Sequence, residues 1–404
     1  METGRSIFIL GATRFGSEVE STSYNLAKEF AKKDAVYYIE YPFTLSDRLT
    51  RRNRNQLKFR QNAISGKNDG IIASGIPNLN IVVVPTLLSI HFMPEGKLYR
   101  KLLSYNEHLI AKRVNKIIRN NSLRNIIYIN SFVFHYPNLA DFIHPRLRIY
   151  HCVDPINNSF DLKHGLPSEK ILIGKSDLVI CTSQQLWREK SRLHNSTYFV
   201  PNAADIYHSI KATDRTLPIH RALENIPKPI VGYFGNIESR IDYELMREVA
   251  DRNKEIHFVF AGPIEKHLVP AFFYSIPNIH FTGRIAYEQM PNMIKGFQVA
   301  IIPFKKKEES SAVFPLKLFE YLGAGKPVVA TDFNPDLQNI TGDLVTYCSN
   351  AEQFSDALNF ALGDDRPELE ARRIELAKQH TWQKRVLYIN SLIENKQKKE
   401  EVLE

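Results

Sequence analysis

The stretch from Ile301 to Pro335, IIPFKKKEESSAVFPLKLFEYLGAGKPVVATDFNP, decides which fold class we expect. It consists of an apolar strand, a long polar loop, a short helix that begins at Pro315 and ends near Gly325, and a second apolar strand. In a parallel sheet the free N–H groups of such a helix point beyond the carboxyl end of the strand, where anions bind. The loop matches neither the P-loop nor the dinucleotide-binding fingerprint. The features that remain at this place are the helix N-terminus, Lys317 in its first turn and Glu320 on the following turn.

The same alternation of strands and helices extends to both sides of this stretch. Upstream of it lie the strand-like segments PIVGYFGN (229–236), HFVFAGP (257–263) and VAIIPF (299–304). An earlier series begins with SIFILG (6–11), whose following loop GATRFG precedes a helix and another strand. Regular alternation of this kind predicts an α/β protein with two doubly wound, Rossmann-like sheets. Two such domains are expected to face each other across a ligand-binding cleft.

The domain boundaries follow from this pattern and from a proline-marked connector. The chain of 404 residues is also longer than one hydrophobic core usually organises. We expect a C-terminal helix that crosses back to the N-terminal domain. The expected parts are an N-terminal Rossmann-like domain 1–205, a linker 206–228, a C-terminal Rossmann-like domain 229–385 and a helix and tail 386–404.

Charge is unevenly distributed along the chain. The net charge is +9, but residues 1–200 contain 28 Lys and Arg against 16 Asp and Glu, and most of the excess lies in residues 51–150. This basic half includes residues 45–70, expected to be a mobile excursion with helical pieces, and an amphipathic helix over 96–120. A basic domain suggests an anionic partner such as a membrane surface, a lipid phosphate or a nucleic acid, or else a solvated face with no partner. No nucleic-acid-reading motif accompanies the charge, so we do not expect nucleic acid.

The cysteines and the N-terminus bear on localisation. Cys152, Cys181 and Cys348 lie far apart without metal-ligand spacing, which fits a reducing compartment. The apolar run after Arg5 is too short for a signal peptide or a membrane span. We therefore expect a cytoplasmic protein that is peripheral on the inner face of the cell membrane, with an anionic membrane surface as partner.

The second half resembles a known family. The matching segments are VGYFGNIESRIDYELM, HFVFAGP, PNIHFTGRIAYEQMP, VAIIPF, PLKLFEYLGAGKPVVAT and HTWQKR, in this order. They resemble the nucleotide-sugar-binding domain of GT-B glycosyltransferases, in particular the retaining family 4 and its bacterial relatives that build surface polysaccharides. A weaker likeness continues through YHCVDP, SDLVICTSQQL and VPNAAD in the first half.

The resemblance implies a donor site. The helix after the long loop would point at the donor diphosphate, and Glu320 would bind the ribose hydroxyls. Arg240 and Lys317 would neutralise the diphosphate and stabilise the leaving group. The simpler alternatives are a solvated Glu320 paired with Lys317 and an exposed loop arginine at position 240. The donor-binding candidates are Gly235, Asn236, Arg240, Gly262, Arg284, Ile285, Phe314, Pro315, Leu316, Lys317 and Glu320.

One position departs from the family pattern. The family commonly carries a second glutamate eight positions before the ribose-binding one, in contact with the transferred sugar. Here that position is Ala312, and Glu308 and Glu309 are out of register. The donor sugar therefore does not follow from the resemblance, and the retaining mechanism is less firmly implied.

The acceptor side offers several candidates after strands of the first sheet. His135, His151 and Asp154 each follow or end such a strand, and Asp154 would be the base if the reaction inverts configuration. Each is alternatively a structural hydrogen-bonding residue. The candidate acceptor loop contains Gly11, Thr13, Arg14, Phe15 and Gly16. The full set of candidate catalytic residues is His135, His151, Asp154, Arg240 and Lys317.

The expected function is transfer of a sugar from a nucleoside-diphosphate sugar to a hydroxyl of a lipid-linked cell-surface glycan, by a retaining hexosyltransferase. The alternatives are a catalytically degenerate membrane-associated scaffold and a nucleotide-sugar epimerase. The resemblance implies no metal and no cofactor, since the helix dipole and basic residues stabilise the diphosphate. The adjacent Asp364 and Asp365 lie far in sequence from the phosphate site, and there is no DxD motif.

Overall fold

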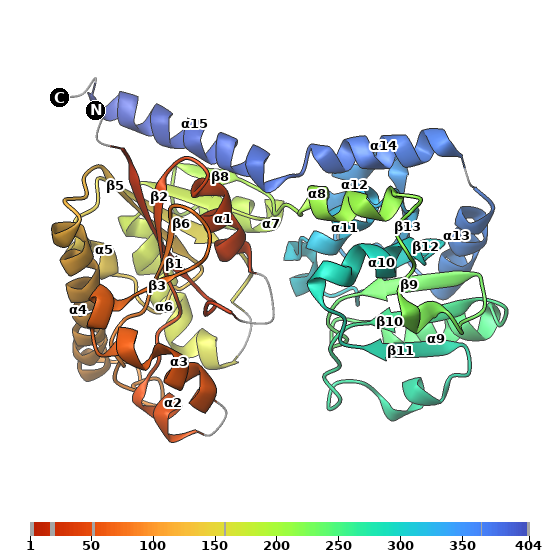
Figure 1. The fold of residues 1–404 in the computed structure, drawn as a ribbon, viewed down its shortest axis with the longest axis horizontal. Helices are drawn as coiled ribbons and strands as arrows, with labels where there is room; N and C mark the ends of the chain where they lie inside the picture. The colour runs from red at the N-terminus through yellow and green to blue at the C-terminus, as the bar shows by residue number, and fades with distance from the viewer. Residues whose placement is uncertain (1–3, 17–20, 51–52, 157–158, 365, 402–404) are drawn as a thin grey trace. The chain divides into compact units, whose positions relative to one another are not determined.

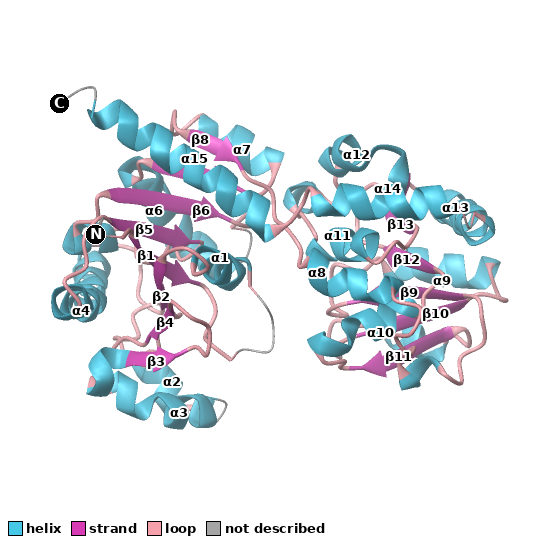
Figure 2. Cartoon of the chain, turned by 45° about the horizontal axis from the view of Figure 1, so that its top comes forward, coloured by secondary structure: helices cyan, strands magenta, loops and turns pink. Residues whose placement is uncertain are grey.

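The computed structural model describes residues 4–16, 21–50, 53–156, 159–364 and 366–401. The chain divides into two compact units. The first contains residues 1–201 together with 386–404, and the second contains residues 202–385 (Figure 1). Each unit is an open, twisted sheet with helices around it (Figure 2), so the predicted pair of α/β domains is confirmed.

The first unit is built on an eight-stranded sheet within its described residues. Its strand order is β3-β4-β2-β1-β5-β6-β7-β8, and all neighbours pair in parallel except the antiparallel β3 and β4. The order reverses between β1 and β5, the position where such sheets open a ligand site. The strands are β1 (Ser6–Gly11), β2 (Ala35–Ile39), β3 (Ile71–Ala73), β4 (Leu79–Val82), β5 (Ile126–Ser131), β6 (Leu147–Cys152), β7 (Leu178–Cys181) and β8 (Thr197–Phe199).

Helices cover this sheet, and the longest is the predicted amphipathic one. Its buried positions include Leu103, Ile110, Val114 and Ile117, which recur at helical spacing and pack into the core of the unit. The helices are α1 (Thr22–Phe30), α2 (Leu45–Leu49), α3 (Arg54–Ile64), α4 (Lys97–Asn120), α5 (Leu139–Ile143), α6 (Ser159–Lys175), α7 (Gln184–Ser191) and the part of α15 (Trp382–Glu401) from Val386 onward.

The second unit is built on a six-stranded parallel sheet in the order β11-β10-β9-β12-β13-β14. Its order reverses between β9 and β12, so the strand that opens the stretch Ile301–Pro335 lies at the switch point. The strands are β9 (Ile230–Phe234), β10 (His257–Ala261), β11 (Ile279–Gly283), β12 (Val299–Ile302), β13 (Val328–Thr331) and β14 (Val345–Cys348). The helices are α8 (Ile206–Ser209), α9 (Tyr243–Arg252), α10 (Met290–Lys295), α11 (Leu316–Gly323), α12 (Pro335–Thr341), α13 (Ala351–Gly363) and α14 (Pro367–Lys378).

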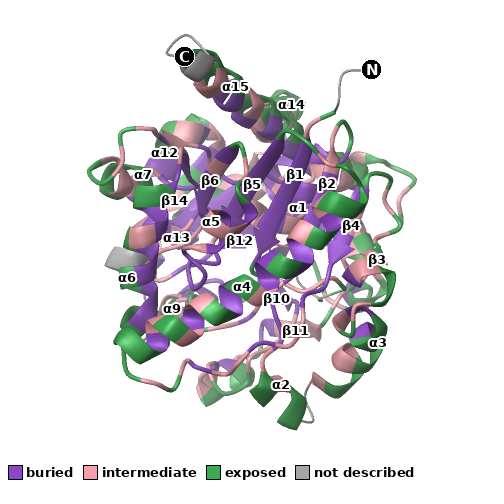
Figure 3. Cartoon of the chain, turned by 90° about the vertical axis from the view of Figure 1, so that its left-hand side faces the viewer, coloured by how far each residue is buried: buried purple, intermediate pink, exposed green. Residues whose placement is uncertain are grey.

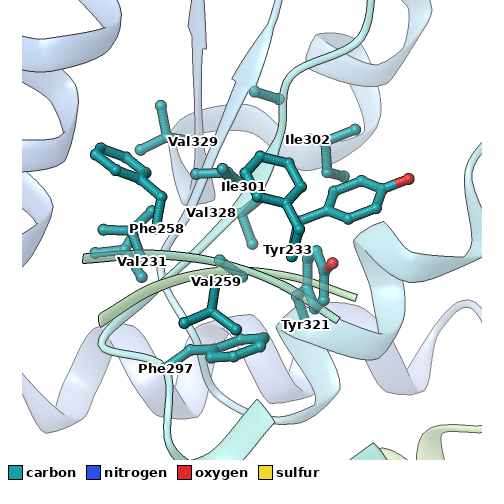
Figure 4. Close-up of a cluster of buried hydrophobic side chains, with 14 of the residues drawn as sticks. Val231, Tyr233, Phe258, Val259, Phe297, Ile301, Ile302, Tyr321, Val328 and Val329 are labelled. Carbon is teal, nitrogen blue, oxygen red and sulfur yellow. The ribbon is translucent and has the colours of Figure 1, made fainter. Parts of the chain in front are cut away.

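Aliphatic and aromatic side chains of these strands form the core of the second unit (Figure 4). The ring of Phe297 packs directly over Gly232, where a Cβ atom would come within 2.2 Å of it. The hydroxyl groups of Tyr233 and Tyr321 point away from the aliphatic side chains in Figure 4. The core thus ends in polar atoms on the side where α11 packs.

One segment differs from the expected organisation. Residues 206–228, expected to be a linker, fold as part of the second unit, and Ala212 and Leu223 are buried in its core. The helical pieces expected within residues 45–70 are present as α2 and α3. The burial of Arg60 in α3, in an ion pair described below, was not foreseen.

Among the described residues, no helix combines the length and the apolar character needed to cross a bilayer.

Candidate active site

The carboxyl edge of the second sheet carries the helix predicted to bind an anion. In α11 the residue before the helix is Pro315, and no side chain caps its N-terminus. Tyr321 fixes the helix to the sheet, because its hydroxyl accepts a 2.7 Å hydrogen bond from the backbone N–H of Phe234. Leu318, Phe319 and Leu322 are buried in the core. The first-turn N–H groups are therefore held rigidly at the end of β12 without a side chain of the helix start to satisfy them.

Lys317, in the first turn of α11, does not extend into solvent. Its Nζ lies 3.8 Å from the centre of the Tyr233 ring and donates a 2.5 Å hydrogen bond to the Tyr233 hydroxyl. That hydroxyl in turn donates a 2.8 Å hydrogen bond to the backbone carbonyl of Asn236. The amine thus packs on the aromatic ring of Tyr233 in β9, beside the loop that follows that strand.

Burial governs the charge of this amine. Removal from water lowers the pKa of Lys317 to about 7; Glu320 acts in the opposite direction, Arg240 lowers the pKa further, and Glu238 raises it. These electrostatic effects place Lys317, Glu320, Arg240 and Glu238 in one neighbourhood. The fold therefore brings together three of the charged donor-site candidates, Lys317, Glu320 and Arg240, and adds Glu238, which the sequence analysis did not single out.

Two glycines shape the backbone beside Lys317. Gly235 has φ +140° and Gly262 has φ +146°, values that side-chain-bearing residues rarely adopt. A Cβ atom on Gly235 would lie 2.6 Å from the Lys317 Nζ, and one on Gly262 would lie 2.2 Å from the Gly235 carbonyl oxygen. The N–H of Gly235 donates to the carbonyl of Ala261 at 2.9 Å, and this bond joins the ends of β9 and β10. The absence of a side chain at these two positions thus lets the Lys317 amine and the two strand ends pack closely against one another.

Arg240 lies at the rim of this region. Its side chain is 52% exposed, and its Nε is 3.2 Å from a carboxylate oxygen of Glu238. Its backbone carbonyl accepts a 2.7 Å hydrogen bond from the N–H of Lys305. A half-exposed guanidinium with one weakly held partner is able to turn toward an anion at the helix terminus.

The remaining donor-side candidates are distributed around the same edge. Phe314 is buried, whereas Leu316 and Glu320 are half-buried on α11. Arg284 is exposed and Ile285 half-buried directly after β11. Their contacts with a nucleotide stay predictions.

Ala312 occupies the position where the family pattern has a sugar-contacting glutamate. It is fully buried at the end of the short helix Glu308–Ala312. The side chains of Glu308 and Glu309 lie outside the described part of the structure, as does Asp365. The oxygens of Asp364 bind Arg366 at 2.6 and 2.9 Å. Position 312 itself therefore offers a methyl group inside the protein.

In the first unit, the candidate acceptor loop after β1 is anchored by hydrogen bonds. A Cβ atom on Gly11 would lie 2.0 Å from the Tyr38 hydroxyl, which bonds to the Thr13 hydroxyl at 2.9 Å. The Arg14 guanidinium lies 3.6 Å from the centre of the Phe43 ring and donates to the carbonyls of Tyr41 and Pro42. Most of the bonding capacity of these side chains is used within the loop and its neighbours.

A buried ion pair beneath this loop was not foreseen from the sequence. Arg60 of α3 and Glu40 after β2 are 1% and 2% exposed and lie 2.5 Å apart. Glu40 also accepts the N–H of Phe15 at 3.1 Å, and Arg60 donates to the carbonyl of Phe15. The pair therefore fixes the loop that carries Phe15 and Gly16. The only sequence signal was a glutamate after an apolar strand, which does not reveal its partner.

His135 and His151 have different environments. His151 is buried, bonds to the Ser131 hydroxyl at 2.9 Å, and burial lowers its pKa to about 3. These features favour the structural alternative for His151, and its contact with an acceptor stays a prediction. His135 lies 3.0 Å from a carboxylate oxygen of Asp161, and burial, then His91 and His164, lower its pKa to about 3. Asp161 was missed in the sequence because it belongs to the next helix, α6.

Asp154 remains the acceptor-side candidate that the fold leaves partly exposed. It lies two residues after β6, at the carboxyl edge of the first sheet. His135 follows β5, the neighbour of β6 in that sheet. Parallel strands end at the same edge, so Asp154 and the His135–Asp161 pair belong to the same side of the first unit.

Comparisons with known proteins agree with this architecture. Sucrose-phosphate synthase from Thermosynechococcus elongatus is 14% identical with a TM-score of 0.66, and the match covers 97% of this chain and 98% of that one. Anabaena HepE, solved in complex with UDP, is 13% identical with a TM-score of 0.64, covering 97% of this chain and 100% of that one. The fold is that of the GT-B glycosyltransferases.

The sequence comparisons identify the second unit more specifically. Residues 228–364, which lie in the second unit, match the family described as glycosyl transferases group 1. TuaH of Bacillus subtilis (strain 168), whose name assigns it provisionally to teichuronic acid biosynthesis as a glycosyltransferase, is 27% identical over 200 residues. That match covers 46% of this chain and 50% of TuaH, so the chain spans about half the length of this curated relative.

Proposed function

We propose that the protein is a glycosyltransferase that moves a hexosyl group from a nucleoside-diphosphate sugar to a hydroxyl of a lipid-linked cell-surface glycan. The observation that carries the proposal is the arrangement of Lys317, the uncapped N-terminus of α11 and the closely packed glycines Gly235 and Gly262. A cation and a helix N-terminus, with backbone that no side chain covers, suit a diphosphate.

The neighbours support the nucleotide part of this proposal. HepE has been solved with UDP, and also with UDP and glucose at a TM-score of 0.63 over 96% of this chain. TuaH, by its name, supports a cell-surface polysaccharide as product. We extend the proposal to retention of anomeric configuration on the family resemblance, and to a peripheral location on the inner face of the cell membrane.

In the proposed reaction the bond between the anomeric carbon and the diphosphate oxygen breaks, the acceptor hydroxyl oxygen forms the new bond to that carbon, and the hydroxyl proton passes to the departing diphosphate oxygen. Lys317, Arg240 and the α11 N-terminus stabilise the negative charge that develops on the leaving diphosphate. Glu320 holds the ribose hydroxyls as a two-oxygen acceptor. On the acceptor side Asp154 and the His135–Asp161 pair orient sugar hydroxyls. We propose that no metal ion takes part, so chelation with EDTA should leave the rate unchanged.

The test is transfer and binding with UDP-, GDP- and dTDP-sugars, comparing the protein with Lys317→Met. Binding of one nucleoside diphosphate and its weakening in the variant support the donor site. Transfer to extracted lipid-linked glycan, with NMR assignment of the product anomer, tests the acceptor and the stereochemistry. Absence of binding to every nucleotide would overturn the proposal.

A second candidate function is a nucleotide-binding scaffold without transfer, favoured by the buried Ala312 in place of a sugar-contacting glutamate. A scaffold would bind a nucleoside diphosphate but neither hydrolyse nor transfer the sugar. A nucleotide-sugar epimerase would instead convert the donor without any acceptor, and product analysis of that reaction separates it from both.

A further inference from the structure

Three segments at the carboxyl edge of the first sheet expose large apolar side chains. They are α2 after β2, residues 86–98 after β4, and the first half of α6 after β6. α2 has no buried residue (Figure 3). The exposed side chains, 41% to 87% accessible, are Leu45, Leu49, Phe92, Leu98, Leu162 and Leu166. Single exposed leucines are ordinary, but six in three segments of one sheet edge form a feature that needs a partner.

Hydrogen bonds join the first two segments. The N–H of Leu45 donates to the carbonyl of Leu87 at 2.9 Å, and the N–H of Ser46 donates to the Ser89 hydroxyl at 2.8 Å. The Arg48 Nε donates to the Thr86 hydroxyl at 3.0 Å. α2 therefore packs along the start of segment 86–98.

His164 and Arg100 join segment 86–98 to α6. One ring nitrogen of His164 bonds the Met93 carbonyl and the other the Glu95 carboxylate, each at 3.0 Å. Arg100 binds Glu95 at 2.7 Å and donates to the Ser168 hydroxyl at 2.9 Å. The three segments are thus joined to one another at this edge of the sheet, and we call their six exposed apolar side chains together the apolar ridge.

The charges around the apolar ridge are mainly positive. The exposed cations within its segments and the adjoining turn of α4 are Arg48, Lys97, Lys101, Lys163 and Lys170. Its carboxylates are engaged: Glu95 by Arg100 and His164, Asp161 by His135, and Asp47 by the Thr44 N–H at 2.8 Å. Exposed cations among exposed apolar side chains complement an interface that is anionic at its surface and apolar beneath it.

We infer that the apolar ridge docks the first unit on an anionic lipid bilayer, with Leu49, Phe92 and Leu98 inserted among the acyl chains. The same sheet edge carries Asp154 and the His135–Asp161 pair, because α6 contributes both Asp161 and the apolar Leu162. Docking would therefore place the acceptor-side residues next to lipid headgroups. The inference rests on the proposed function for the membrane location and the identity of the acceptor, and it adds the surface that makes the contact.

Vesicle flotation tests the inference without donor or acceptor. The full chain is mixed with phosphatidylcholine vesicles, with and without phosphatidylglycerol. We expect binding to the anionic vesicles that weakens with added salt. Phe92→Ser with Leu98→Ser should lower the vesicle partition coefficient by roughly tenfold or more, since each buried side chain contributes strongly to insertion. Lys97→Gln with Lys163→Gln should lower it by about tenfold or more through lost attraction to anionic lipid.

The matched control is Phe360→Ser, a 68% exposed phenylalanine of α13 in the second unit, which should leave vesicle binding unchanged. All variants change exposed side chains, and equal thermal melting temperatures would establish that they fold. Equal binding by the chain and the Phe92/Leu98 variant would overturn the inference, as would no binding to anionic vesicles. A dimer seen by light scattering that dissociates in that variant would assign the ridge to self-association instead. Failure of nucleotide binding would affect the proposed function but not this result.

Discussion

The amine nitrogen of Lys317 lies 3.8 Å above the centre of the Tyr233 ring and hydrogen-bonds the hydroxyl of the same residue. Two elements distant in sequence meet here, since the residues are 84 positions apart. The contact keeps a cation of the first helical turn ready beside the Gly235 loop. Because burial lowers its pKa to about 7, the amine is partly neutral at physiological pH.

Nucleotide binding should therefore take up a proton. A diphosphate favours the charged form of Lys317, which raises its pKa in the complex. Affinity for the preferred nucleoside diphosphate should be nearly constant below about pH 7 and fall by up to about tenfold per unit above it. Isothermal titration calorimetry in buffers of different ionisation enthalpy measures the uptake directly. Lys317→Met should remove it and the exposed Lys254→Met should not; equal uptake by Lys317→Met and the unchanged protein would refute the assignment.

Gly262→Ala should destabilise the second unit and weaken nucleotide binding. The new Cβ would lie 2.2 Å from the Gly235 carbonyl oxygen, at a φ of +146°. We expect a loss of about 2 kcal/mol or more in the free energy of unfolding, measured by urea denaturation. Gly363→Ala is the control, because nothing lies within 4 Å of the added atom. A stability equal to that of the control variant would show that the local backbone relaxes freely.

Arg60→Met should be strongly destabilising although the substitution makes the basic region less charged. It leaves the buried Glu40 carboxylate without its guanidinium, a loss of roughly 3–5 kcal/mol. Glu40→Gln combined with Arg60→Met should cost less than the sum of the two single changes, because no charge then remains buried. Urea denaturation of the four proteins gives this coupling directly. Additive losses would mean that the pair contributes no interaction of its own.

His135 and His151 should respond differently to substitution by glutamine. His135→Gln should lower the turnover number with little change in nucleotide affinity, because the acceptor-side pair with Asp161 is lost. His151→Gln should lower stability and leave turnover per folded molecule unchanged.

The pH dependence of stability checks the role of His151 independently. Its folded pKa of about 3 lies below the unfolded value, so the unfolded chain binds the extra proton between the two. Stability should therefore be full above about pH 6.5 and fall as the pH drops, by about 1.4 kcal/mol per pH unit for this residue. The His151→Gln protein should lose that part of the slope. An unchanged slope would mean that another group titrates.

Ala312→Glu should not create a better transferase. Position 312 is fully buried, so a carboxylate there would lose its hydration without a prepared partner. We expect a lower thermal melting temperature and no gain in transfer rate. Ala286→Glu, at an exposed position, should be tolerated. A stable, faster Ala312→Glu enzyme would show that the family's sugar-binding geometry is retained here.

Much of the fold was predictable because its signals are local. Alternating apolar runs and the Pro315 and Gly325 boundaries predicted the second sheet and α11, and the helical spacing of Leu103, Ile110 and Val114 predicted α4. The prediction that residues 206–228 form a linker was wrong. Ala212 and Leu223 are buried in the core of the second unit, but no apolar pattern around them in the sequence indicates it. The contacts of Glu320 and Arg284 with a nucleotide stay predictions.

The sequence by itself determined the two α/β units and the residues that carry charge at their strand ends, since periodicity and helix boundaries depend on neighbouring residues. Only the tertiary structure decided the state of those charges. Arg60 is basic in sequence yet pairs with buried Glu40, and Lys317 rests on Tyr233. His151 and His135 look alike after their strands, but Ser131 faces one and Asp161 the other. Desolvation and hydrogen-bond partners come from residues far along the chain, so no local pattern contains them.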